Sequence, residues 1–110
     1  MSDSTEQAEQ TELTVRDAPD EHRYEIREGE RVLGIAVYRR RGDVTGTVTE
    51  FLHTEVDQDA GRPGVGGTLV RAALDDVRAR GGSVVPSCPF VRGWIDRHGE
   101  YADLVVRSDS

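Results

Sequence analysis

Lysine is absent from this chain of 110 residues, so all 14 of its basic residues are arginine. They stand against 21 acidic residues, which gives a formal net charge of −7 at pH 7 with histidine counted as neutral. A surface so rich in carboxylates repels nucleic acid and anionic lipid, and we expect neither nucleic acid nor a membrane as a partner. Codon bias alone would explain arginine in place of lysine but not the excess of acid, so the pattern favours a halophilic host.

Cysteine and long apolar stretches are also scarce. The one cysteine, Cys88, has no second thiol with which to form an internal disulfide, which is typical of a cytoplasmic protein. No run of about 18 apolar residues could cross a membrane, and the N-terminal residues lack the cationic and apolar regions of a secretory signal. The length and the 35% apolar content predict a single cytoplasmic domain, which we expect to be a monomer or a weak dimer.

The first half of the chain alternates in the manner of β-strands. Residues 1–12 are polar and acidic without periodicity, which predicts a disordered tail followed by a single domain over residues 13–110. Strands separated by turn residues are expected over residues 13–17, 24–28, 31–40 and 44–56. The last is long for one strand, which predicts a bend or bulge near Gly46 or Glu50.

Alternation also assigns side chains to the two faces of each strand. In the third strand, one face is expected to carry Leu33, Ile35 and Val37, and the other Val32, Ala36 and Tyr38. In the fourth strand, the apolar even positions include Val48, Leu52 and Val56, whereas the opposite face carries Phe51, His53 and Glu55.

Helical periodicity replaces alternation in the second half. A helix is expected over residues 64–80, stopped by Gly81-Gly82, with a buried stripe of Val65, Leu69, Val70, Ala73, Leu74 and Val77. A short buried strand over residues 83–86 precedes a second helix over residues 89–98, with Phe90, Val91, Trp94 and Ile95 pointing inward. A last strand is expected over residues 101–106. The order predicts an α/β fold, in which an antiparallel meander crosses over to a parallel strand and two main helices cover a mixed sheet.

A glycine-rich segment, residues 61–68, lies between the fourth strand and the first helix. The free N–H groups and the dipole of a helix start favour a phosphate at this place. A triphosphate-binding loop would need lysine at position 67, which is Gly67, and the dinucleotide fingerprint would need glycine at position 69, which is Leu69. The segment therefore predicts an anion site that belongs to neither of these two classes.

What remains, Gly61-Arg62-Pro63-Gly64-Val65-Gly66, resembles the pyrophosphate-binding loop Gln/Arg-x-x-Gly-x-Gly/Ala of GNAT acetyltransferases. The segments around it, residues 53–56 and 85–91, strengthen the likeness to a compact, single-domain subgroup of N-acetyltransferase-like proteins. The resemblance covers roughly residues 13–106. It implies two splayed parallel strands, ending near Val56 and Pro86, with the pantetheine arm of acetyl-coenzyme A between them.

The resemblance also implies which residues hold acetyl-coenzyme A (acetyl-CoA). They are Thr54, Glu55, Val56, Arg62, Gly64, Val65, Gly66, Gly67, Thr68, Cys88, Pro89 and Phe90. Two positions depart from the family pattern: Gly61 replaces the usual glutamine or arginine, and Pro63 lacks an N–H that could face a phosphate. These departures concern affinity for coenzyme A, with Arg62 as a possible substitute for the missing side chain.

Cys88 and His53 are the candidate catalytic residues. Cys88 precedes Pro89, where a helix N-terminus would stabilise a thiolate, and we expect its thiol to be partly accessible. It could carry the acetyl group covalently, tune the site without reacting, or be inert, and we favour the tuning role. His53 could deprotonate the acceptor amine, because an ammonium cannot attack a thioester. Glu50 and Glu55 are alternative bases, and a purely structural histidine is the alternative for His53.

Together these features predict an acetyl-CoA-dependent N-acetyltransferase that acts on an unidentified small-molecule or peptide amine. The alternative is a coenzyme-A-binding module that senses acyl groups without turnover. The sequence holds no Cys-x-x-Cys or paired-histidine spacing, so no metal is expected.

Overall fold

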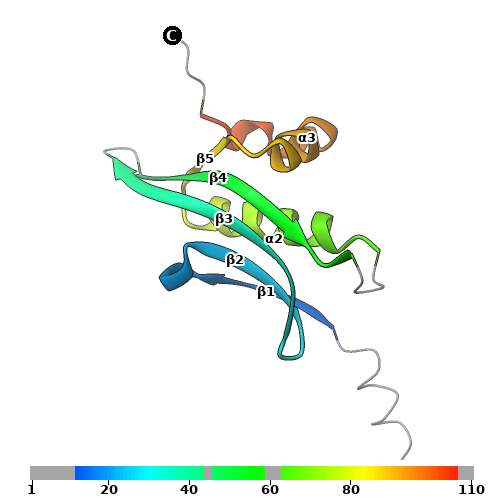
Figure 1. Ribbon diagram of the computed structural model, residues 1–110. Coiled ribbons are helices and arrows are strands. Elements are labelled where there is room, and N and C mark those ends of the chain that lie inside the picture. Colours follow the sequence, from blue (N-terminus) through cyan, green and yellow to red (C-terminus); the bar gives the residue numbers. More distant parts are fainter. Residues whose placement is uncertain (1–11, 44–45, 59–62, 107–110) are drawn as a thin grey trace, which may run out of the picture.

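The computed structural model describes residues 12–43, 46–58 and 63–106 (Figure 1). The predicted tail, apart from Glu12, and the loop residues Gly61 and Arg62 lie outside these ranges. No helix among the described residues is long and apolar enough to cross a membrane.

Five strands form one mixed sheet in the order β1-β2-β3-β4-β5. β1 (Leu13–Ala18), β2 (Arg23–Glu28), β3 (Arg31–Asp43) and β4 (Gly46–Val56) are antiparallel neighbours, and β5 (Ser83–Pro86) pairs in parallel with β4. The turn from β2 to β3 depends on Gly29, whose φ of 62° is a conformation that glycine adopts without a steric penalty. The predicted meander and parallel crossover are confirmed.

Two β-bulges change which side chains face the core. The register places Leu33 as an extra residue on β3 and Leu52 as an extra residue on β4. Each extra residue reverses the side of the sheet on which the following residues fall. Leu33 is therefore buried together with Ala36 and Tyr38, and the predicted grouping of Leu33 with Ile35 and Val37 is wrong.

The bulge at Leu52 has the same effect on β4. Phe51 is buried at 1% exposure, whereas Leu52 is 39% exposed. The prediction that Phe51 shares a face with His53 and Glu55 is wrong, because the bulge lies between them. A bend or bulge was predicted on this strand near Gly46 or Glu50, and the observed extra residue lies two positions after Glu50.

Two helices follow the predicted periodicity. α2 (Val65–Ala79) buries the six predicted residues against the sheet, and α3 (Pro89–Arg97) packs beside α2 and against β4 and β5 (Figure 1). The predicted last strand is wrong, because the 3-10 helix η3 (Gly99–Leu104) takes its place. Tyr101 and Leu104 are three residues apart, the spacing at which a 3-10 helix brings two side chains to the same side, and both are buried. Only the following residue, Val105, forms a single bridge to Val84.

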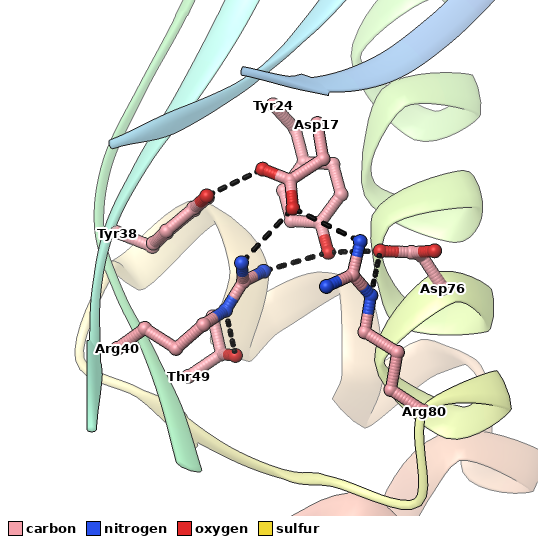
Figure 2. Close-up of polar contacts among 7 residues, drawn as sticks. All are labelled: Asp17, Tyr24, Tyr38, Arg40, Thr49, Asp76 and Arg80. Carbon is pink, nitrogen blue, oxygen red and sulfur yellow. Dashed lines mark hydrogen bonds and ion pairs between the residues drawn. The ribbon is translucent and has the colours of Figure 1, made fainter. Parts of the chain in front are cut away.

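A partly buried polar network ties the sheet to the C-terminal half of α2 (Figure 2). On the sheet side, Asp17 accepts hydrogen bonds from the Tyr38 hydroxyl and from Nη1 of Arg40 at 2.9 Å. On the helix side, Asp76 accepts from the Tyr24 hydroxyl at 2.6 Å and from Nε of Arg80 at 2.9 Å. Arg80 also reaches Asp17 at 3.2 Å, so the two halves are joined. The network fixes α2 on the sheet and thereby fixes the position of its N-terminus.

Candidate functional site

A cavity of about 460 Å³ lies between the end of β4 and the start of α2. Its described lining residues come from β4, the following loop, α2 and α3, and they are Thr54, Val56, Asp57, Gln58, Pro63, Gly64, Val65, Gly66, Gly67 and Phe90. The cavity therefore lies where the sequence predicted the anion site.

The separation of β4 from β5 opens one side of this cavity. Their pairing ends at Phe51 and Pro86, and the N–H of Cys88 makes a further bond to the Phe51 carbonyl at 2.8 Å. β4 then continues to Val56, and no described strand pairs with this last part on the β5 side. A main-chain edge is thus left accessible beside Thr54 and Val56.

The N-terminus of α2 forms the opposite wall. Gly64 caps the helix with a φ of 79°, a left-handed conformation that favours glycine, and the first turn carries no acidic residue. The first N–H that bonds within the helix is that of Thr68, which donates to the Gly64 carbonyl at 2.9 Å. The preceding N–H groups and the positive end of the helix dipole border the cavity and favour an anion there.

Two further glycines of α2 have a packing role that the sequence analysis missed. A Cβ at Gly66 would lie 2.8 Å from Cζ of Phe90, and a Cβ at Gly67 would lie 3.3 Å from Nε1 of Trp94. The absence of side chains therefore lets the aromatic rings of α3 approach α2. Phe90 itself is 42% exposed at the cavity, so the prediction that it points into the core is wrong.

Asp57 is the one titratable group among the described lining residues. Its carboxylate forms an ion pair of 3.0 Å with Arg31, and its N–H donates to the Leu33 carbonyl. Arg31 offsets the charge that would otherwise repel an anion in the cavity.

Cys88 lies behind the cavity wall. It occupies the N-cap position of α3, and its Sγ is 3.4 Å from Oγ1 of Thr54, which does line the cavity. The thiol is only 3% exposed because it packs into the core, so the expectation of partial accessibility is wrong. Pro89 and Thr68, both exposed, are not among the lining residues.

His53 and Glu55 point to the face of the sheet opposite to α2, which we call the outer face. They alternate with Thr54 and Val56 of the cavity, and Nε2 of His53 is 2.8 Å from Oε2 of Glu55. The His53 side chain is 59% exposed. The structure therefore brings His53 together with Glu55 and not with Cys88.

Glu50 is held at the point where β4 and β5 begin to separate. Its carboxylate accepts hydrogen bonds from Oγ of Ser87 at 2.6 Å and from Nη2 of Arg39 at 2.9 Å. These two hydrogen bonds lower the pKa of Glu50, because they stabilise the ionised carboxylate. Ser87 and Arg39 carried no signal in the sequence, because their roles depend on pairing between strands.

Comparison with known proteins places this geometry in a family. The sequence model of GCN5-related N-acetyltransferases matches residues 23–104. The fold is similar to the crystal structure of a ribosomal-protein-alanine N-acetyltransferase from Brucella melitensis biovar Abortus 2308, with a TM-score of 0.50 and 19% sequence identity. The match covers 80% of this chain and 63% of that one, so the chain spans less than two thirds of that protein's length. A search of curated proteins gives no significant match.

Proposed function

Because the chain belongs to the GCN5-related N-acetyltransferase family, we propose that it transfers an acetyl group from acetyl-CoA to an amine. The observation that carries the proposal is the cavity where β4 leaves β5 and the N-terminus of α2 begins. It joins an anion-binding helix start to an accessible main-chain edge, the two features that a pyrophosphate and an amide-containing pantetheine arm require.

The residues present fit acetyl-CoA, which supplies the acetyl group as an activated thioester. The N–H groups from Gly64 to Gly67 would hold the pyrophosphate, with Arg62 as a further contact. The edge from Thr54 to Val56 would hold the pantetheine arm and polarise the thioester carbonyl. Phe90 would form the wall at the acyl end, with Cys88 packed behind Thr54. The cavity has room for a ligand, and the carboxylate of Asp57 is already paired with Arg31.

The acceptor amine must lose a proton before it can attack, and we assign this step to His53. The contact with Glu55 orients the imidazole on the outer face. The amine would therefore approach from the outer face, through the gap between β4 and β5, and pass its proton to His53 directly or through one water. Glu50 and Glu55 are the alternative bases. The hydrogen bonds to Glu50 lower its pKa, which weakens this carboxylate as a base.

A coenzyme-A-binding module without turnover is the second candidate. It is favoured by one observation: among the described lining residues of the cavity, the single titratable group is Asp57, and this carboxylate is engaged by Arg31. A module of this kind would bind acetyl-CoA and release no thiol when amines are added.

Calorimetric titration with acetyl-CoA, in molar salt, tests the binding step. We expect acetyl-CoA to bind more tightly than ATP or NAD, and an absence of heat at millimolar acetyl-CoA would contradict both candidates. Thiol release with a panel of amines, polyamines and peptides then separates the enzyme from the module. For the enzyme, His53→Gln should lower turnover by about 100-fold or more without weakening acetyl-CoA binding, with Glu21→Gln as an exposed control.

A further inference from the structure

The outer face of the sheet carries a buried carboxylate, that of Glu25. Its neighbours in β2, Tyr24 and Ile26, point into the core, so Glu25 lies on the opposite side of the strand. A charged side chain on the outside of a sheet is normally solvated, yet Glu25 is only 3% exposed. The side chains that cover it therefore decide what this part of the outer face can bind.

Two arginines of β2, one on each side of Glu25, cover the carboxylate. Nε and Nη2 of Arg23 lie 2.9 and 2.8 Å from Oε2, and those of Arg27 lie 3.0 and 2.8 Å from Oε1. Burial disfavours the charged form of Glu25, but the hydrogen bonds from Arg27 and Arg23 outweigh this effect and lower its pKa. Glu25 therefore stays ionised and holds both guanidiniums in place.

The two arginines keep donors for a second anion. A guanidinium has five N–H groups, and Nη1 of Arg23 and of Arg27 makes no hydrogen bond within the ranges that the structure describes. The two side chains are 31% and 28% exposed. Arg16, the partner of Glu25 on β1, is exposed and adds a third guanidinium. These four residues, the arginine cluster, have three positive charges and one negative charge, and they favour a carboxylate as ligand.

The strand register places the arginine cluster across the outer face from the proposed base. Glu25 pairs with Ile35, which pairs with Glu55, and in the adjacent row Val37 pairs with His53. Neighbouring strands are about 4.8 Å apart, so the cluster lies about 10 Å from the side chains of β4. Ile35 and Val37, both half-buried, form an apolar floor between the two.

The two ends of this floor differ in charge. The arginine cluster is positive, whereas Glu50 and Glu55 provide carboxylates on the same strand as His53. An acceptor with an amine at one end and a carboxylate about 10 Å away matches both ends. An extended peptide advances about 3.3 Å per residue, so the side chain of its third or fourth residue reaches this distance from the N-terminal amine. A polyamine would instead place a cation on the arginines.

We propose that the acceptor is a peptide with a free N-terminal amine and an acidic side chain at its third or fourth residue, which the arginine cluster binds. The inference rests on the proposed function, since it names the acceptor of the same reaction. It makes Arg23 and Arg27 specificity-determining residues, and Glu25 a positioning residue that acts through them. The net charge of −7 alone would favour a cationic acceptor, so the two expectations differ.

The test compares Ala-Ala-Asp-Asp-Ala-amide with Ala-Ala-Asn-Asn-Ala-amide on the unmodified protein, at the lowest salt concentration at which it stays folded. Thiol release from acetyl-CoA should give a kcat/KM about tenfold higher for the acidic peptide, because it gains charge-assisted hydrogen bonds. Calorimetric titration with the same peptides should show the same preference in binding.

The two measurements separate this inference from the proposed function. If the neutral peptide reacts and binds as well as the acidic one, the inference is overturned and the proposed function stands. If the acidic peptide binds preferentially but no amine releases thiol, the anion site stands and the proposed transfer is wrong. If neither peptide binds or reacts, the inference is overturned, and thiol release with another amine would leave the proposed function intact.

Substitution of the two arginines identifies the partners of the acidic side chain. Arg23→Gln and Arg27→Gln should each reduce the preference for the acidic peptide to about threefold or less, mainly by raising its KM. Arg97→Gln, an exposed arginine on α3, is the matched control and should keep the full preference. A preference that persists when Arg23 and Arg27 are changed together would overturn the assignment of the cluster.

Glu25→Gln separates positioning from charge. The substitution makes the outer face more positive, so a purely electrostatic attraction would raise the preference for the acidic peptide. If Glu25 positions the guanidiniums, the preference should fall by about threefold or more, with a higher KM for the acidic peptide. Circular dichroism verifies that this variant is folded, and the arginine variants test the site independently of it. A higher preference in folded Glu25→Gln would overturn the positioning role.

Discussion

At the scale of single residues, the position of Cys88 limits its chemistry. A covalent acetyl carrier must meet both the thioester and the acceptor, whereas this thiol is almost fully buried and contacts the hydroxyl of Thr54. Direct attack by an oriented amine needs no covalent intermediate. The contact with Thr54 instead allows Cys88 to set the position of the strand edge along which we propose that the pantetheine arm lies.

Cys88→Ser tests this tuning role. Turnover should fall by about tenfold or less, which corresponds to about 1.4 kcal/mol or less in the barrier, and acetyl-CoA binding should be kept. Because the thiol is buried, iodoacetamide should modify the folded protein much more slowly than the unfolded chain. Mass spectrometry during turnover provides the decisive observation. An acetyl adduct on Cys88 that forms and disappears at the rate of turnover would replace the tuning role with covalent catalysis.

At the scale of elements, glycine lets both ends of α2 approach a neighbouring element closely. At the start of the helix the neighbour is α3, and just after its C-terminal end the neighbour is the backbone of β4. Gly81 has a φ of 72°, and the N–H of Gly82 donates to the Val77 carbonyl at 3.0 Å, which ends the helix where Gly81-Gly82 was predicted to end it. A Cβ at Gly82 would lie 2.8 Å from the carbonyl oxygen of Thr47 on β4. This oxygen belongs to the backbone and cannot rotate away.

Gly82→Ala should therefore lower the free energy of unfolding by about 2 kcal/mol, since the strand or the turn must shift. Gly99→Ala is the matched control, because a Cβ there would meet no atom within 4 Å and its change should stay within about 0.5 kcal/mol. Urea unfolding of both variants at one salt concentration measures the difference. Equal stability of the two variants would mean that the chain accommodates the Cβ without strain.

The elements differ in how far the sequence predicts them. The order of strands and helices and the buried stripe of α2 follow from periodicity, because each depends on residues close together in the chain. The positions of the bulges at Leu33 and Leu52 do not, since an extra residue is defined only by the partner strand. The prediction that His53 shares a face with Phe51 is wrong for this reason, although His53 does share a face with Glu55. The last segment was read as a strand because two buried side chains three residues apart carry too little periodicity to identify a 3-10 helix.

The candidate site was predicted in part. Its centre, at the helix start after a long strand, follows from the glycines and from the change of periodicity. The contacts that join separate elements, Cys88 with Thr54 and Glu50 with Ser87, arise only when β4 and β5 are paired. A smaller cavity between α2 and α3, whose lining includes Arg71 and His98, was missed for the same reason, because its walls come from two helices whose packing the sequence does not specify.

At the scale of the whole molecule, all three tyrosines hold hydrogen bonds between distant parts of the chain. Burial raises the pKa of Tyr24 well above its usual range, and the hydrogen bond to Asp76 raises it further. Burial and the bond to Asp17 raise the pKa of Tyr38 to about 12, and burial and the bond to Asp75 raise that of Tyr101. Each phenol is thus favoured in its neutral form by the folded state.

An alkaline titration tests this linkage. Because the folded pKa values lie above the unfolded value of about 10, the stability that they contribute is complete below about pH 10 and is lost as the pH rises toward about 12. Tyrosinate absorbance should therefore appear together with the loss of helical circular dichroism. Tyrosinate absorbance that titrates near pH 10 while the circular dichroism stays unchanged would contradict the network of Figure 2.

The net charge of −7 leads to the last prediction, which concerns salt. Repulsion among surplus carboxylates acts over long distances, and at 1 M salt the Debye length falls to about 3 Å, so this repulsion is screened. Short, partly buried ion pairs such as Asp17 with Arg40, at 2.9 Å, are screened much less. The melting temperature should therefore rise with potassium chloride into the molar range, as expected for a chain adapted to salt.

A charge-reduced variant separates this mechanism from the general strengthening of apolar burial by salt. Changing the exposed residues Asp20, Glu21, Glu30 and Asp96 to the corresponding amides reduces the formal net charge from −7 to −3. If repulsion is the cause, the variant should melt at a higher temperature in dilute buffer and gain less from added salt than the parent. If the melting temperature rises equally steeply with salt in both proteins, the salt effect comes from apolar burial. If the melting temperature of the parent does not change with salt, codon bias is left as the explanation for the absence of lysine.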